Sequence, residues 1–407
     1  MVTVQLKFVD AGDLYVSWRW EHALDQPRVL ILPRALVQDA LDELAHALPS
    51  PLPGESSHQA LVRSITHGPL LDHPRETALA ERLARALLPA RLAAELNELL
   101  TQGVRPHLRI QPSPSTAQVP WEALRVDEGE RVIHHADVSV LPPATVRNAP
   151  DRRVSPFTPD GQVVAVLDPR VPGFDDNSAL GSVLGSIALL PEEPLTHLLD
   201  IHGSRREDQD RDYLATALVD ASRFLYVGHV TTGAHGLDAR LHLSCRADTT
   251  GRAAPIGAHR PLTAADIVLG HRPGPPSPWR TPNRAALIAC ESGGDLRFAE
   301  PTGLTTALVH TGAEYVVATR WTLPTDAGLA HLARTPPSTS TLAPAITAIH
   351  RAQRSATPIG ALGAWQQDQA TRWEQTADPA HTPLIWAAFA TTWAPHGPTH
   401  SVEPRVS

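Results

Sequence analysis

Short apolar runs recur through the second half of the chain, and longer segments of helical character separate them. The runs cover residues 163–167, 224–227, 285–289 and 315–319. Runs of this length predict buried strands of a parallel sheet. The intervening segments predict helices, at 208–221, 302–310 and 342–355. This alternation predicts an α/β fold with right-handed crossovers between parallel strands.

The first third of the chain has a different pattern. Apolar and polar residues alternate in places, which predicts strands that are partly antiparallel, and Leu and Ala recur at three- and four-residue steps, which predicts helices. In chain order the signals predict strands at 2–8, 14–18 and 29–32, helical periodicity over 33–48 and 75–100, and a strand at 108–110.

These patterns suggest a division of the chain. We expect residues 1–104 to form a smaller α+β region and residues 105–398 to form the main region. Residues 142–161 are rich in Pro, Asp and Arg and lack periodicity, so they are the best candidate for a linker. Residues 399–407 are expected to be a flexible tail.

Two of the apolar runs stop at a reactive residue. The first stops at His229 and the second at Cys290, which Glu-Ser-Gly-Gly follows directly. Functional groups of parallel sheets lie just past the carboxyl ends of the strands, so both residues should reach one rim of one sheet. A thiol nucleophile needs a base and backbone donors for the oxyanion, and small residues after Cys290 let backbone amides approach a substrate. The pair therefore favours a cysteine hydrolase.

A structural role is the competing interpretation for each residue. A cysteine that ends an apolar run is often a buried structural thiol, and a histidine at a strand end is often an ordinary hydrogen-bonded side chain. Cys245 serves as the internal comparison, because it follows residues 241–244 in a predicted peripheral strand without a glycine-rich turn. We interpret Cys245 as structural.

Composition limits the classes of partner. The 407 residues carry a net charge of −8, so there is no basic surplus for nucleic acid. No apolar stretch approaches the roughly 20 residues that span a bilayer. With two cysteines and no signal peptide, the sequence predicts a soluble cytoplasmic protein with reduced thiols, and no nucleic-acid or membrane partner.

Other chemistries lack their motifs. The sequence contains no phosphate-binding G-x-x-x-x-G-K-[ST] loop, no G-x-S-x-G turn and no H-E-x-x-H pair, and its 21 histidines are scattered. Two cysteines cannot build a four-cysteine zinc site. The sequence therefore predicts no cofactor and no metal.

Five further stretches form an ordered set: Pro112-Ser-Pro with Val119-Pro-Trp-Glu-Ala-Leu124, Tyr226-Val-Gly-His229, Leu287-Ile-Ala-Cys290-Glu-Ser-Gly293, residues 303–321 and Pro383-Leu-Ile-Trp-Ala-Ala-Phe389. Taken in this order, they resemble one known family, the CHAT domains, which are caspase-like cysteine peptidases related to separase and more distantly to caspases. The resemblance runs over about 105–390 and implies a caspase-like three-layer α/β/α fold. It also allows residues 1–104 to be a degenerate caspase-like half or a docking region.

The resemblance assigns roles to particular residues. The histidine and cysteine of the family correspond to His229 and Cys290, which would form a peptide-hydrolysing dyad. In the related caspases the amide of the residue after the histidine and the amide of the cysteine bind the oxyanion, which here implies the backbone N–H groups of Val230 and of Cys290 or its neighbours. The family usually has glycine where this chain has Val230, and a β-branched residue does not readily adopt φ > 0.

A substrate pocket is also implied. The family places an aspartate four residues after a tryptophan, whereas here Asp326 lies five residues after Trp321. These two residues are the pocket candidates, and an ordinary acid at a helix N-terminus is the alternative for Asp326.

By resemblance, the expected activity is that of an endopeptidase for specific protein or peptide substrates in a regulated or defence pathway. Related proteins often carry helical repeats that act as sensors. This chain lacks such repeats, so a separate regulatory or sensor protein is expected. The alternatives are an inactive caspase-like adaptor that binds a partner and, more remotely, another thiol hydrolase or acyltransferase.

Overall fold

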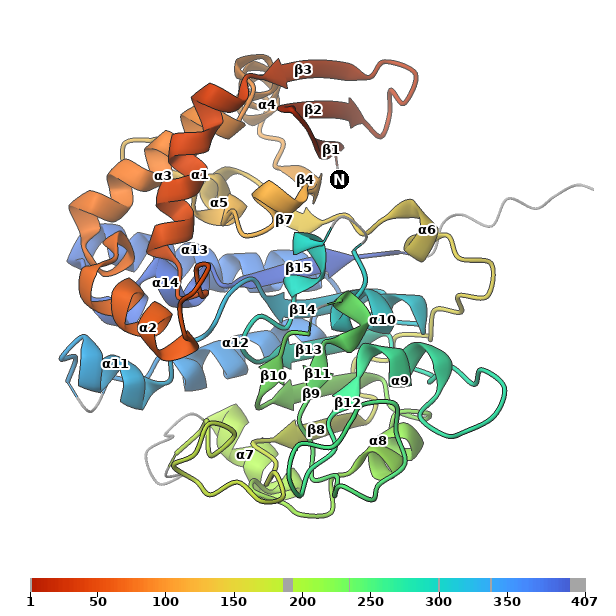
Figure 1. Ribbon diagram of the computed structural model, residues 1–407. Coiled ribbons are helices and arrows are strands. Elements are labelled where there is room, and N and C mark those ends of the chain that lie inside the picture. The colour runs from red at the N-terminus through yellow and green to blue at the C-terminus, as the bar shows by residue number, and fades with distance from the viewer. Residues whose placement is uncertain (1, 186–192, 234, 299–300, 337–338, 396–407) are drawn as a thin grey trace, which may run out of the picture.

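The computed structural model describes residues 2–185, 193–233, 235–298, 301–336 and 339–395. The tail expected at 399–407 lies outside the described residues. Ten strands form one mixed sheet in the order β3-β2-β1-β4-β7-β15-β14-β13-β9-β8 (Figure 1). Most neighbouring strands are parallel, while β2, β3 and the β14–β15 pair are antiparallel. The predicted α/β class is confirmed.

The strands of this sheet are β1 (Val2–Ala11), β2 (Asp13–Trp20), β3 (Arg28–Leu32), β4 (Pro106–Gln111), β7 (Asp137–Val140), β8 (Val163–Leu167), β9 (Arg223–Val227), β13 (Arg284–Ile288), β14 (Tyr315–Thr319) and β15 (Phe389–Trp393). The main helices are α1 (Arg34–Ala47), α3 (His73–Leu87), α4 (Ala90–Thr101), α7 (Glu193–His202), α8 (Arg211–Ala217), α9 (Ala264–Leu269), α10 (Leu304–His310), α12 (Leu342–Arg354) and α13 (Pro358–Thr376).

The central strands are buried on both faces, which explains their continuous apolar sequences. In β9, Leu225 and Val227 belong to a core that includes α7, α12 and α13, whereas Phe224 and Tyr226 belong to a second core with α8, α9 and α10. Successive side chains of a strand point to opposite faces, so the two cores lie on opposite sides of the sheet. This gives the three layers that the sequence predicted.

Two local predictions were wrong in detail. The periodicity over 75–100 is interrupted, because α3 ends at Leu87 and α4 begins after Pro89, whose ring removes a backbone donor. The strand expected over 241–245 ends early, because β11 (Arg240–Leu241) stops before Cys245.

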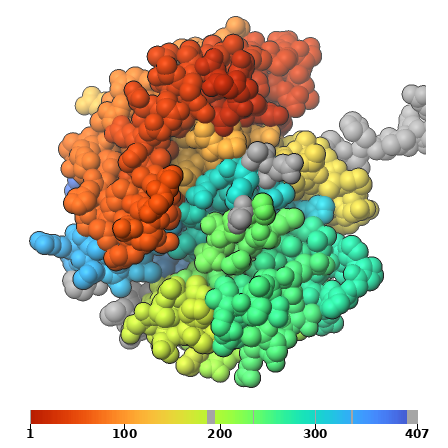
Figure 2. Space-filling view, viewed as in Figure 1, coloured from red at the N-terminus to blue at the C-terminus, as the bar shows by residue number. Residues whose placement is uncertain are grey.

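The N-terminal strands extend the same sheet. β1 pairs in parallel with β4, and β2 and β3 follow as an antiparallel meander. Figure 2 shows these residues, in red and orange, at one end of the molecule, with the green segment at the other. The division between residues 104 and 105 falls inside this continuous sheet, and it stays a proposal.

The segment 142–161 connects β7 to β8 across the helical layer. It contains the short helix α6 (Ala144–Arg147), and the buried Arg152 donates hydrogen bonds to the carbonyl groups of Val309, Ala313 and Ala394. These bonds attach the segment to the end of α10, to the turn after it and to the residue that follows β15.

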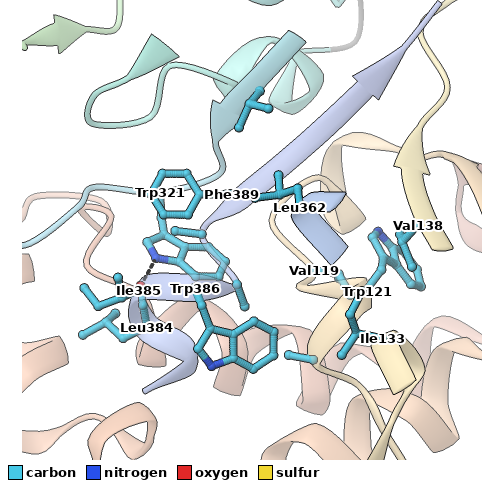
Figure 3. Close-up of a cluster of buried hydrophobic side chains, with 14 of the residues drawn as sticks. Val119, Trp121, Ile133, Val138, Trp321, Leu362, Leu384, Ile385, Trp386 and Phe389 are labelled. Carbon is cyan, nitrogen blue, oxygen red and sulfur yellow. Dashed lines mark hydrogen bonds between the residues drawn. The ribbon is translucent and has the colours of Figure 1, made fainter. Parts of the chain in front are cut away.

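The tryptophan-containing motifs belong to one hydrophobic core, in which Figure 3 shows Trp321 and Trp386 in one group and Trp121 in another. Glu122 is buried and accepts a hydrogen bond from Arg320 Nη2 at 2.9 Å, while Arg320 Nη1 donates to the carbonyl of Ala387 at 2.8 Å. One buried guanidinium therefore joins segments that are far apart in sequence. The Glu122 carboxylate balances its charge, and Glu122 and the Ala387 carbonyl accept its hydrogen bonds.

A second buried ion pair joins α3 to α13. Arg131, in β6 (Glu130–Arg131), is fully buried and binds both carboxylate oxygens of Glu76 at 2.7 Å. Its Nη2 also donates to Glu374 at 2.7 Å, and the indole of Trp373 donates to Glu76 at 2.9 Å. The buried ion pairs of Arg131 with Glu76 and Glu374 thus attach the N-terminal helix α3 to the main region.

We expect Glu76→Ala to lower the free energy of unfolding by about 3–5 kcal/mol, because the substitution leaves a buried guanidinium without its main partner. Equilibrium urea unfolding followed by circular dichroism measures this loss. The matched control is Glu98→Ala on the exposed side of α4, which should change stability by less than about 0.5 kcal/mol. Equal losses of stability in the two variants would contradict a stabilising role for the buried Glu76–Arg131 ion pair.

Candidate active site

His229 and Cys290 are placed side by side by the pairing of two strands. β9 and β13 are parallel and in register, with Val227 opposite Ile288. His229 and Cys290 each lie two residues beyond this last pair, and the Gly228 amide continues the ladder to the Ile288 carbonyl at 3.3 Å. Both residues are half-buried at the carboxyl rim. The structure therefore brings together the two residues that the sequence singled out.

The His229 ring is oriented by a backbone carbonyl. Its Nε2 lies 2.7 Å from the carbonyl oxygen of Gly181. Because a carbonyl oxygen can only accept, this contact assigns the ring hydrogen to Nε2 and leaves the Nδ1 lone pair for another partner. Burial lowers the pKa of His229, against the opposing effects of the Gly181 carbonyl and Asp168. The imidazole is therefore held in its neutral form, which can accept a proton.

Asp168 fixes the loop that carries Gly181, and sequence reasoning missed it. It directly follows β8, the strand beside β9, and is 1% exposed. Its carboxylate accepts hydrogen bonds from Ser182 Oγ at 2.6 Å and from the Val183 amide at 3.1 Å. A weaker ion pair of 3.4 Å joins it to Arg205. The available signal was an acid at the end of the strand next to the histidine strand.

Cys290 is held as a neutral thiol. Its Sγ donates to the Leu323 carbonyl at 3.9 Å, and burial raises the pKa of the thiol, with a further increase from the Glu291 carboxylate. Among the described residues no hydrogen bond joins Cys290 to His229. The resting pair is therefore a thiol beside a neutral imidazole, not a preformed ion pair.

The turn after Cys290 is tightly fixed. Glu291 adopts a left-handed backbone with φ of 49°, a conformation that is uncommon for a residue with a side chain and that clusters at functional sites. Its carboxylate pairs with Arg297 at 3.1 Å. The amides of Glu291 and Gly293 donate to the carbonyls of Trp321 and Thr319, and the Ser292 amide donates to the Thr319 hydroxyl. These three amides are already used, so the amides of Cys290 and Val230 are the remaining oxyanion candidates from the sequence.

Val230 has an extended backbone. It begins β10 (Val230–Thr231), which pairs antiparallel with β11, and its side chain is buried in the second core. The non-glycine residues with positive φ in the described part of the chain are Asp168, Arg205, Glu291, Arg334 and Ala377. Val230 is not among them, so its backbone avoids the left-handed conformation that a β-branched residue resists.

A chain of neutral histidines supports this strand. His259 Nδ1 lies 2.8 Å from the Cys245 carbonyl, His259 Nε2 lies 3.1 Å from His242 Nδ1, and His242 Nε2 lies 2.9 Å from the Thr231 hydroxyl. Since the carbonyl can only accept, every contact is satisfied when each ring carries one hydrogen, on Nδ1. Burial lowers the pKa of His242 to about 3 and that of His259 to about 4. Protonating either ring would remove an acceptor from the chain.

The side chains of the two pocket candidates are bound to other parts of the fold, although the Trp321 carbonyl accepts the Glu291 amide at the rim. Trp321 is 1% exposed, and its indole donates to the Leu384 carbonyl at 2.9 Å (Figure 3). Asp326 begins α11 (Asp326–Leu332), and its carboxylate accepts hydrogen bonds from the Thr341 amide at 2.9 Å and the Thr341 hydroxyl at 2.7 Å, at the start of α12. A pocket role for either residue stays a prediction.

The described residues contain no group of three or more His, Cys, Asp or Glu side chains placed to hold a metal ion. In the same part of the chain, no helix combines the length and apolar character needed to cross a membrane.

Comparison with known proteins identifies one family model. The model of the CHAT domain matches residues 77–394. No curated protein matches the sequence. Two crystal structures of the Saccharomyces cerevisiae separase–securin complex, at 3.0 and 2.6 Å resolution, are similar with a TM-score of 0.46 and sequence identities of 10% and 11%. Each match covers 96% of this chain and 30% of the separase chain, so the chain spans about a third of the separase it resembles.

We expect Glu291→Gln to lower the pKa of the Cys290 thiol, because the substitution removes a negative charge that disfavours the thiolate. The rate of Cys290 alkylation by iodoacetamide, measured against pH by mass spectrometry, should rise at lower pH than in the unchanged protein. Glu98→Gln, at an exposed carboxylate on α4, is the control. An unchanged or upward-shifted profile for Glu291→Gln would contradict the electrostatic account.

Proposed function

The chain belongs to the CHAT domain family, and on that premise we propose that it is a cysteine endopeptidase in which His229 and Cys290 form the dyad. The observation that carries the proposal is the in-register pairing of β9 and β13, which sets both residues two positions past the same pair. An imidazole beside a thiol at the open rim of a sheet is what acyl transfer from a peptide requires.

The proposed reaction begins with the two groups neutral. His229 accepts the thiol proton through Nδ1 while Nε2–H stays bonded to the Gly181 carbonyl. The Cys290 thiolate attacks the peptide carbonyl carbon, and the negative charge that develops on the carbonyl oxygen is met by the backbone amides of Cys290 and Val230. The imidazolium then protonates the leaving amine, and water hydrolyses the thioester to free the thiol.

Asp168 has a positioning role in this proposal. It holds the loop from Ser182 to Leu184 through its carboxylate, and that loop presents Gly181 to the His229 ring. The carboxylate also opposes the effect of burial on the His229 pKa, which helps the ring accept a proton during the reaction.

Substrate and cellular context belong to the proposal as well. The substrates would be proteins or peptides, and a separate regulatory protein would control the enzyme. The similar crystal structures hold separase in a complex with securin, and for this chain we likewise propose a separate partner protein. Both cysteines are free thiols, as a reducing compartment maintains, so we place the activity in the cytoplasm.

A catalytically inactive adaptor is the second candidate. It is favoured by the raised pKa of Cys290, by the thiol contact with the Leu323 carbonyl and by the valine that follows His229. In this case the rim of the sheet would bind a partner protein without cleaving it.

Cys290→Ala and His229→Ala should each reduce peptide cleavage by roughly a thousandfold or more. The two residues act as one catalytic unit, so removing either one removes most of the contribution of both. The assay is mass spectrometry of a random-sequence peptide library incubated with purified protein. Cys245→Ala is the matched control and should cleave at the unchanged rate. Cleavage that survives Cys290→Ala would refute the dyad, and an unchanged protein that cleaves no peptide would favour the adaptor.

A further inference from the structure

The outer edge of β3 is unlike the rest of the sheet. β3 is the first strand in the sheet order, and no other described strand pairs with its free edge. It stands at the extremity of the molecule in Figure 1. Its sequence is Arg28-Val-Leu-Ile-Leu32, and the side chains of Val29, Leu30 and Ile31 are 66%, 40% and 49% exposed. An exposed apolar edge strand is a template for pairing with another chain.

The opposite end of the sheet shows how this fold protects an edge. β8 is buried along its length except at Val163, and Ser204 forms a parallel bridge to Leu167 at its outer side. β3 carries no lysine, no internal proline and no bulge in its ladder with β2, which are three of the devices that block edge pairing. The exposure of β3 is therefore specific to this end.

Both faces of β3 offer apolar surface. On one face Ile31 lies beside Tyr15, which lies beside Val9, so an apolar row crosses the three N-terminal strands. Leu30 and Leu32 point to the other face, together with the buried Val16 and Leu14. An added strand would continue both surfaces at once.

The pattern of β3 is symmetrical about its centre. Pro27 and Pro33 bound the strand at equal distances from Leu30, and neither has a backbone donor. We propose that β3 pairs antiparallel with β3 of a second copy of this chain, with Leu30 on the two-fold axis. In this register Val29 faces Ile31 of the second copy twice, and Arg28 faces Leu32. The prolines end the ladder at the same point in both directions.

Charge and flanking residues agree with a second copy as the occupant. The only charged residue of β3 is Arg28, which pairs with Glu95 at 2.5 Å, so like charges do not confront one another across the axis. Leu24, before the strand, and Leu36, after it, are 52% and 72% exposed. Leu24 lies in the turn before the strand and Leu36 in the first turn of α1, so each end of the strand has an exposed apolar side chain close by in sequence.

The proposed dimer leaves the candidate active site open. β3 is the first strand of the sheet, whereas β13 and β9 are the eighth and ninth. Pairing at β3 joins the two sheets end to end and keeps His229 and Cys290 of each copy at the far side. The inference does not depend on whether the site is catalytic.

The test uses the full chain in sedimentation velocity over a range of concentrations. The unchanged protein should form dimers, and Val29→Lys or Ile31→Glu alone should weaken the dimer by roughly tenfold or more, because each places two charges against apolar residues of the other copy. The double variant, Val29→Lys with Ile31→Glu, sets each new ammonium opposite a new carboxylate of the second copy, so it should recover dimerisation.

Val219→Lys, at an exposed apolar residue after α8, is the control and should leave the dimer unchanged. Thermal unfolding checks that each variant is folded. A monomer at all concentrations, a dimer insensitive to the single substitutions, or a double variant no better than the single ones would each overturn the proposal. A monomeric protein whose β3 binds an extended peptide would identify a different partner.

Discussion

The in-register parallel pairing of β9 and β13 is the constraint on which the candidate site depends. Parallel strands end at one rim, and a shift of one residue would turn His229 and Cys290 to different faces. β8 and β14 continue the same arrangement on either side, so Asp168 and the backbone of Thr319 reach the rim from the outer strands. Four strand ends thus supply the proposed base, the residue that fixes its orienting loop, the thiol and the support for the turn.

The polar groups around the site are fixed by partners that allow little freedom. The Gly181 carbonyl determines which nitrogen of His229 carries hydrogen, and the histidine chain from His259 to Thr231 is satisfied only in its neutral form. Glu291 acts in the opposite direction, because its charge raises the pKa of the neighbouring thiol. In the proposed mechanism, the thiol would therefore lose its proton only when a substrate carbonyl is present, and no thiolate would exist in the resting protein.

Much of the fold could be predicted from the sequence, because strands that are buried on both faces have continuous apolar runs. The apolar runs that end at His229 and Cys290 predicted two strands. They also predicted that the two residues lie close together, because the carboxyl ends of parallel strands meet at one rim of the sheet. Asp168 was missed because its role depends on a loop that folds back beside His229, which residue spacing does not encode. The split between α3 and α4 was missed although Pro89 marks it. Asp326 illustrates a different limit, because the acid at the start of α11 also caps α12, a contact made only in three dimensions.

The most direct test of the central claim is covalent trapping with a peptide that carries an acyloxymethyl ketone, followed by mass spectrometry of the native protein. The account predicts one adduct, on Cys290 and not on Cys245, which forms much faster than an adduct with a free thiol and is lost in His229→Ala. Labelling of Cys290 at the rate of a free thiol, or labelling that is unaffected by His229→Ala, would contradict the claim that β9 and β13 assemble a working dyad.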